Sequence, residues 1–174
     1  MNEKLTVNMN LGDITKIPVD IIVNSANRSL MRGSGVCGAI HKVAGKELEK
    51  ECMEIKAKLG LDFLSIGETI VTKAYNLPAR YVIHTVGAKN NGKEDILLIK
   101  NCYYNSLRKA EELKVSSISF PAISTGVYGL PLIKSAEMVK EVLNSLPELN
   151  YLKKIILVMK SIEDQEIYSK ILSS

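Results

Sequence analysis

Six short apolar runs alternate along the chain with longer segments of helical periodicity, and this order is what most limits the fold. We expect strands over 5–9, 20–23, 68–72, 81–86, 117–120 and 154–159. Several of these runs are continuously apolar, as strands buried on both faces are. Strands that alternate with helices form a largely parallel sheet covered on both faces. The predicted fold is therefore a three-layer α/β/α sandwich with a mostly parallel mixed sheet.

The longest helical pattern spans about Val36 to Leu59 and is predicted as one helix, which Gly60 ends. Its apolar stripe recurs at spacings of three and four residues and consists of Ile40, Ala44, Leu48, Cys52, Ile55 and Leu59. Further helices are predicted over about 95–113, from a first turn at Pro131, and after Glu163.

Size and composition favour one globular domain over residues 1–174, with no internal repeat or linker. The cysteines, Cys37, Cys52 and Cys102, form no CxxC pair, so neither a disulfide framework nor a zinc ribbon is indicated. No apolar run approaches the ~20 residues that span a membrane. The net charge of +4 is scattered and does not decide the class of partner. We expect a cytoplasmic monomer without membrane contact.

The first motif with chemical meaning is a glycine loop, residues 33–36, between a buried strand and a helix. Glycines let the backbone approach a ligand closely, and the free N–H groups at a helix start favour an anion. A phosphate site is therefore predicted, with a plain strand-to-helix turn as the alternative. The loop is neither GxGxxG nor GxxxxGK[ST], which excludes the Rossmann and P-loop motifs.

A second glycine loop, residues 124–129, also follows a buried strand and precedes a helix. The carboxyl ends of strands are where open α/β sheets hold ligands. Two such anion sites can straddle one diphosphate, although two unrelated connections remain the alternative. The pair of loops predicts a diphosphate ligand more strongly than either loop alone.

Five segments resemble successive signatures of the macrodomain family, occur in the family's order and cover nearly the whole chain. They are Gly12-Asp13-Ile14-Thr15, Val23-Asn24-Ser25-Ala26-Asn27, Gly35-Val36-Cys37-Gly38-Ala39-Ile40-His41, Tyr81-Val82-Ile83-His84-Thr85-Val86-Gly87 and Pro121-Ala122-Ile123-Ser124-Thr125-Gly126-Val127-Tyr128-Gly129. The resemblance is closest to the MacroD-type hydrolases, which remove ADP-ribose from proteins or deacetylate O-acetyl-ADP-ribose. It implies a macrodomain fold and ADP-ribose as ligand.

The resemblance also implies roles for individual residues. Asp13 would accept a hydrogen bond from the adenine amino group, Asn27 would contact the distal ribose, and Tyr128 would cover that ribose. The two glycine loops would hold the diphosphate through backbone N–H groups. The predicted ligand-binding residues are Asp13, Ile14, Asn27, Gly33, Ser34, Gly35, Val36, Ser124, Thr125, Gly126, Val127 and Tyr128. If the resemblance is set aside, the alternative roles are a helix cap for Asp13, a turn residue for Asn27 and a packing residue for Tyr128.

Two positions depart from the family pattern. Relatives of the hydrolase branch carry an aspartate that helps to place water or ribose hydroxyls, where this chain has Cys37. A carboxylate is ionised at neutral pH and accepts hydrogen bonds, whereas a thiol is mostly protonated and accepts weakly. Lys160 stands where relatives place an aromatic residue against adenine, and its stem could cover the base instead. Asn27 and Cys37 are the candidate catalytic residues, with Cys37 predicted to weaken turnover.

Neither a metal nor a cofactor is predicted. Cys37 and His41 stand four apart on one helix, but zinc needs three or four protein ligands and no further ones are evident. His41 and His84 lie amid apolar residues, which favours structural hydrogen bonding over catalysis.

Three functions follow from the sequence. The first is a non-catalytic module that binds ADP-ribose or mono-ADP-ribosylated protein. The second is an enzyme that hydrolyses ADP-ribosyl or O-acetyl-ADP-ribose esters. A third class, binding of adenine-rich RNA, is disfavoured because the sequence has few aromatic residues for stacking and no basic stripe.

Overall fold

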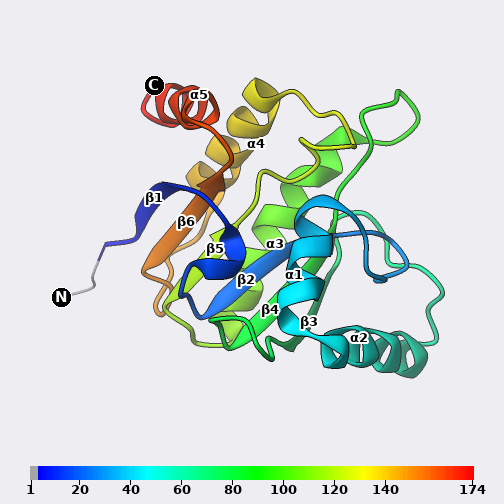
Figure 1. Cartoon of the computed structure of the whole chain (residues 1–174). Coiled ribbons are helices and arrows are strands. Elements are labelled where there is room, and N and C mark those ends of the chain that lie inside the picture. Colours follow the sequence, from blue (N-terminus) through cyan, green and yellow to red (C-terminus); the bar gives the residue numbers. More distant parts are fainter. Residues whose placement is uncertain (1–3) are drawn as a thin grey trace.

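A six-stranded sheet with helices on both faces forms the centre of the computed structural model, which describes residues 4–174 (Figure 1). Residues 1–3, which the predicted domain also includes, lie outside the described residues. The strands are β1 (Thr6–Leu11), β2 (Ile21–Ala26), β3 (Thr69–Lys73), β4 (Tyr81–Val86), β5 (Ser117–Phe120) and β6 (Lys154–Met159). Their order across the sheet is β1-β6-β5-β2-β4-β3.

Four pairings in this sheet are parallel, and only the edge strand β3 runs antiparallel to its neighbour β4. The helices are α1 (Gly35–Ala44), α2 (Lys46–Leu59), α3 (Ile99–Glu112), α4 (Leu132–Ser145) and α5 (Ile162–Leu172), with short 3-10 turns η1 (Ile14–Lys16) and η2 (Ile96–Leu98). The predicted α/β/α sandwich with a mostly parallel mixed sheet is therefore confirmed. No helix within residues 4–174 has the length and apolarity needed to cross a membrane.

Alternating side chains of the strands build two hydrophobic cores, one on each face of the sheet. On β2, Ile21 and Val23 pack into the core under α3, α4 and α5, whereas Ile22 packs into the core under α1 and α2. On β6, Leu157 and Val158 divide between the two cores in the same way. A strand directs successive side chains to opposite faces, so both faces must be covered and three layers result.

The single helix predicted over Val36 to Leu59 is wrong, because Gly45 divides it into α1 and α2. Gly45 has φ 98° and ψ 179°, a left-handed conformation that strains a residue with a side chain. Its N–H bonds to the carbonyl of His41 and ends α1. Leu59 is 56% exposed, so the predicted apolar stripe does not reach the end of α2.

Asp20 joins the start of β2 to the start of β5 and is a local determinant of stability. Its Oδ2 accepts four hydrogen bonds of 2.9 to 3.2 Å, from the backbone N–H and the hydroxyl of Ser116 and of Ser117. Partial burial acts to raise the pKa of Asp20, but these hydrogen bonds outweigh it and hold the pKa below its ordinary value of 3.8.

Asp20→Asn is expected to lower the free energy of unfolding by about 1.5–3 kcal/mol at pH 7, because hydrogen bonds to a charged group contribute that much. A carboxyl pKa that is lower in the folded state adds stability above the unfolded-state pKa, and this stability is lost as the pH falls through the folded-state pKa. The difference between the two proteins should therefore shrink in acid. Urea unfolding across pH checks this, with exposed Asp62→Asn as the matched control. Equal stabilities at pH 7 would contradict it.

Candidate ligand-binding cleft

A cleft with a volume of about 580 Å³ opens along the carboxyl edge of the sheet. It is lined by the segments that follow β1, β2 and β5 and by the end of β6. These four strands are neighbours and run parallel, so their carboxyl ends meet at one edge. The cleft therefore crosses this edge of the sheet from one side to the other. We call its side at β1 and β6 the β6 end, and its side at β2 the β2 end.

All the residues that the sequence predicts for the site line this one cleft, including Cys37 and Lys160. They arrive from four separate segments of the chain. Sequence reasoning assigned no role to several other lining residues, namely Gly12, Ser25, Ala26, Ala39, Pro121, Ala122, Val158, Met159 and Asp164. Most of these lie within the five segments that resemble the family. Asp164 lies outside these segments, near the start of α5, and its place in the cleft becomes visible only in the fold.

Asp13 and Lys160 bring opposite charges to the β6 end of the cleft. Asp13 Oδ1 accepts hydrogen bonds from the N–H of Thr15 at 2.9 Å and from its hydroxyl at 2.6 Å, and so caps η1. These two bonds lower the pKa of Asp13. The carboxylate is therefore ionised at neutral pH, and Oδ2 has no hydrogen bond within residues 4–174. Asp13, which lines the cleft, therefore combines the capping role with an open acceptor.

The first glycine loop leaves backbone donors open at the start of α1. Ser34 is the N-cap residue but makes no side-chain bond to the first turn, and Gly35 takes φ 57°. Among the described residues, the N–H groups of 35–37 have no backbone partner. The helix dipole adds a positive potential at the same point, which makes the first turn of α1 suited to a phosphate.

The second glycine loop is shaped by internal hydrogen bonds. The N–H of Gly129 bonds to the carbonyl of Gly126 at 3.0 Å, and the N–H of Leu130 bonds to the carbonyl of Ser124 at 2.8 Å. Residues 126–128 are left with N–H groups that have no partner within residues 4–174. Ser124 takes φ 68°, and a Cβ at Gly87 would lie 2.2 Å from its Oγ. The Ser124 hydroxyl is thus packed against Gly87, and a ligand would meet this loop through its backbone.

Asn27 holds the loop that leads to the first glycine loop. Its Oδ1 accepts from the hydroxyl of Ser29 at 2.8 Å and from the N–H of Met31 at 3.1 Å, while its Nδ2 donates to the carbonyl of Met31 at 2.8 Å. The turn role therefore holds in the structure. An amide nitrogen carries two hydrogens, so one donor of Asn27 is left for a ligand.

Cys37 lies at the floor of the cleft, 5% exposed, above a buried polar chain. Its Sγ donates to the carbonyl of Met31 and accepts from Nδ2 of Asn24, both at 3.7 Å. Asn24 Nδ2 also lies 3.1 Å from Nδ1 of His84, and the Thr72 hydroxyl lies 2.9 Å from Nε2. The Thr72 hydroxyl donates its hydrogen to a backbone carbonyl, so it must accept a hydrogen bond from Nε2–H of His84. Nδ1 of His84 is then unprotonated and accepts a hydrogen bond from Asn24 Nδ2.

This polar chain fixes His84 as a neutral, structural histidine. Burial lowers the pKa of His84 to about 3, with a further lowering from nearby His41. Burial also lowers the pKa of His41, whose ring centroid lies 6.2 Å from that of His84. Nδ1 of His41 has no hydrogen-bond partner within residues 4–174. In the same part of the chain, no group of three or more His, Cys, Asp or Glu side chains is placed to hold a metal.

Comparisons with known proteins match this sequence and this fold. The family model described as Macro domain matches residues 23–139. The O-acetyl-ADP-ribose deacetylase of Escherichia fergusonii is 42% identical over 165 residues, which are 93% of this chain and 92% of the relative. Two solved structures of the Oceanobacillus iheyensis macrodomain, one of a mutant with ADPR and one with ADP, each superpose with a TM-score of 0.92 at 41% identity. Both cover 99% of this chain, and 95% and 93% of the respective solved chains.

Proposed function

The chain belongs to the macrodomain family, and from this membership we propose that it binds ADP-ribose, free or attached to another molecule, in the cleft at the carboxyl edge of the sheet. Two structures of one similar macrodomain hold ADPR or ADP, which supports a ligand of this class. The observation that carries the proposal is the pair of glycine loops, which line one cleft and whose N–H groups at 35–37 and 126–128 have no backbone partner within residues 4–174. Two neighbouring sets of backbone donors suit a diphosphate.

The chemistry of the cleft supports one direction for the ligand. At the β6 end, the ionised carboxylate of Asp13 offers an acceptor for the adenine amino group, and the stem of Lys160 offers a surface for the ring. The diphosphate then lies between the glycine loops. The distal ribose reaches the β2 end, where Asn27 has one free donor and Tyr128 presents a half-buried ring.

Hydrolysis of ADP-ribosyl or O-acetyl-ADP-ribose esters is the second candidate, because a relative with 42% identity is an O-acetyl-ADP-ribose deacetylase. Asn27 and Cys37 lie beside each other at the β2 end, since a Cβ at Gly33 would be within 3.5 Å of both side chains. Cys37 donates its hydrogen to Met31, so the thiol offers water no strong acceptor. We infer binding with slow turnover.

Competition calorimetry tests the proposed ligand. ADP is expected to displace ADP-ribose at a concentration at least about tenfold lower than adenosine, because one hydrogen bond to a charged group contributes about 1.5–3 kcal/mol. GDP, which lacks the adenine amino group that Asp13 would bind, is the matched control and should compete less well than ADP. Equal competition by adenosine and ADP would place the phosphates outside the glycine loops.

A time course with a protein that carries one ester-linked ADP-ribose separates a reader from an enzyme. The modified protein should bind with an affinity close to that of ADP-ribose, and release of ADP-ribose should be slow. Retention of the modified protein without any release would assign the chain as a reader.

A further inference from the structure

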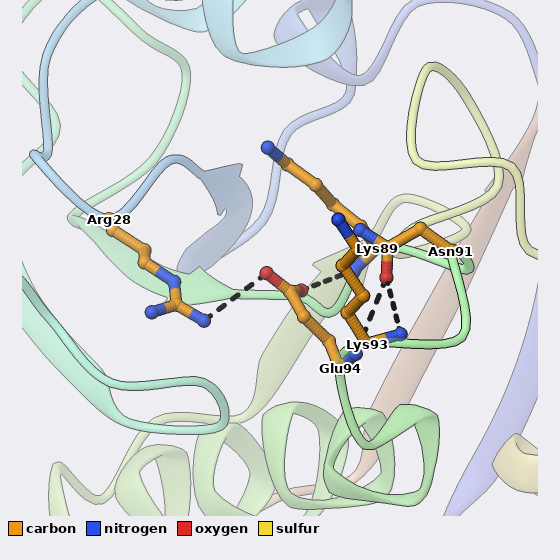
Figure 2. Close-up of polar contacts among 5 residues, drawn as sticks. All are labelled: Arg28, Lys89, Asn91, Lys93 and Glu94. Atoms are coloured by element: carbon orange, nitrogen blue, oxygen red, sulfur yellow. Dashed lines mark hydrogen bonds and ion pairs between the residues drawn. The ribbon is translucent and has the colours of Figure 1, made fainter.

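Residues 89–94, between β4 and η2, contact the two loops that form the walls at the β2 end of the cleft, namely the loop after β2 and the loop after β5. Figure 2 shows how Glu94 joins Arg28 to the backbone of Lys89. On one side, Glu94 Oε1 accepts a hydrogen bond from the guanidinium of Arg28 at 3.3 Å, and Arg28 directly follows Asn27 in the chain. Its second oxygen, Oε2, accepts from the backbone N–H of Lys89 at 2.6 Å. Glu94 therefore ties the loop after β2 to the loop after β4, with its side chain only 21% exposed.

The same segment holds the opposite wall around Tyr128. The N–H of Asn90 bonds to the carbonyl of Tyr128 at 2.8 Å, and Asn90 Nδ2 bonds to the carbonyl of Gly129 at 3.3 Å. Lys89 Nζ lies 5.5 Å from the centre of the Tyr128 ring, within the range of a cation–π contact. The backbone and the ring of Tyr128 are thus both held by residues 89–90.

Strand order places this segment beyond the diphosphate. The cleft runs from β1 and β6 across β5 to β2, and β4 is the next strand. If the adenine of a ligand lies beside Asp13, its phosphates lie between the glycine loops. Only the part of the ligand beyond the phosphates can then contact the walls that Glu94 joins. In the proposed orientation, ADP would end before these walls, whereas the distal ribose of ADP-ribose would reach them.

We propose that Glu94 is a positioning residue that holds Arg28 and, through Lys89, the ring of Tyr128 in place, and so selects ligands with a ribose beyond the diphosphate. The proposal rests on the proposed function. An exposed ion pair alone contributes ~0–1 kcal/mol, but this carboxylate is partly buried and also binds a backbone N–H. Burial raises the pKa of Tyr128 and the charge of Glu94 raises it further, so the two groups interact electrostatically.

Calorimetry with ADP and ADP-ribose on the Glu94→Gln variant tests this role. Glutamine keeps the size of the side chain but lacks the charge, so affinity for ADP-ribose is expected to fall about tenfold, while affinity for ADP changes less than about twofold. Tyrosinate absorbance, referenced to Tyr128→Phe, should show a lower pKa for Tyr128 in this variant. Glu112→Gln is the matched control, because it removes the exposed Lys109–Glu112 pair on α3 and should change neither affinity.

The second variant, Lys89→Met, keeps the backbone donor to Glu94 and removes only the cation beside Tyr128, so it should show the same ligand selectivity with a smaller effect. An equal loss of ADP and ADP-ribose affinity in Glu94→Gln, or no loss of either, would overturn the positioning role. Absence of both affinities in the unmodified chain would instead remove the proposed function, so the two failures are distinguishable.

Discussion

Replacing Gly38 with alanine is expected to lower the affinity for ADP-ribose by at least about 100-fold, the equivalent of two lost hydrogen bonds to a charged group. Gly38 lies in the first turn of α1, where an added Cβ would stand 2.5 Å from the carbonyl oxygen of Gly33. This carbonyl oxygen belongs to the backbone, so it cannot avoid the added Cβ by a side-chain rotation. The first glycine loop must therefore move, and its N–H groups leave the positions that suit a phosphate.

The pattern of ligands identifies the cause of this loss. ADP and ADP-ribose should weaken together, because both use the diphosphate site, while the weak competition by adenosine should persist. Val43→Ala, on the exposed face of the same helix, is the control for nonspecific changes in α1. Circular dichroism and urea unfolding establish that the Gly38→Ala variant is folded. An affinity for ADP-ribose within threefold of the unmodified chain would show that the loop tolerates the extra methyl group.

Continuous apolar runs predicted the strands well where burial is continuous. The bounds of β4, β5 and β6 agree with the prediction. β1 and β2 extend further toward the C-terminus than predicted. These extensions contain polar residues, and hydrogen bonds to neighbouring strands hold them in the sheet. Asn10 pairs with Val158, and Asn24 pairs with His84. A strand that extends into polar residues is decided by its partners, which a single sequence does not display.

The division of the long helix illustrates a second limit of periodicity. Ala44 and Leu48 keep a spacing of four across the break, and both are fully buried, so the apolar stripe continues although the helix does not. Only the backbone at Gly45 changes. A glycine within a helical pattern is tolerated in many helices, so the pattern alone could not separate a break from a continuous helix.

The site could be predicted wherever its residues form local motifs, and it could not where distant segments meet. Glycines and capping residues act within a few positions, so both loops were visible in the sequence. The contact of Asn24 with Cys37 and the contact of Arg28 with Glu94 depend on the paths of intervening loops. No spacing in the sequence encodes those paths, and for that reason the polar chain beneath the cleft and the segment beside Tyr128 emerge only from the fold.

Replacing Cys37 with aspartate is expected to raise the release of ADP-ribose from an ester-modified protein by ~10²–10⁴-fold, the range typical of a positioned acid–base group. Cys37 stands at the cleft floor beside Asn27, where the thiol donates to the Met31 carbonyl. A carboxylate at the same position is ionised at neutral pH and offers water or a ribose hydroxyl a strong acceptor. The missing carboxylate is then what limits turnover.

The surroundings of Cys37 can accept this change at a moderate cost. Asn24 Nδ2, now 3.7 Å from the sulfur, would become a donor to the carboxylate. The Met31 carbonyl loses the thiol donor, keeps the hydrogen bond from Asn27 Nδ2 and faces a negative group, so the loop from Asn27 to Met31 must adjust. A bound diphosphate would also repel the new charge. A modest loss of affinity for ADP-ribose is therefore expected together with the faster turnover.

Cys37→Asn is the matched control, because it has the shape of aspartate without the charge, and it should bind ADP-ribose without the gain in release. Single-turnover release of ADP-ribose, measured with saturating protein, separates the chemical step from the change in affinity. If the unmodified chain already releases ADP-ribose rapidly and Cys37→Asp slows it, the thiol itself takes part in the reaction. In that case the buried amide of Asn24, which donates to the sulfur, becomes the group that supports the reactive thiol.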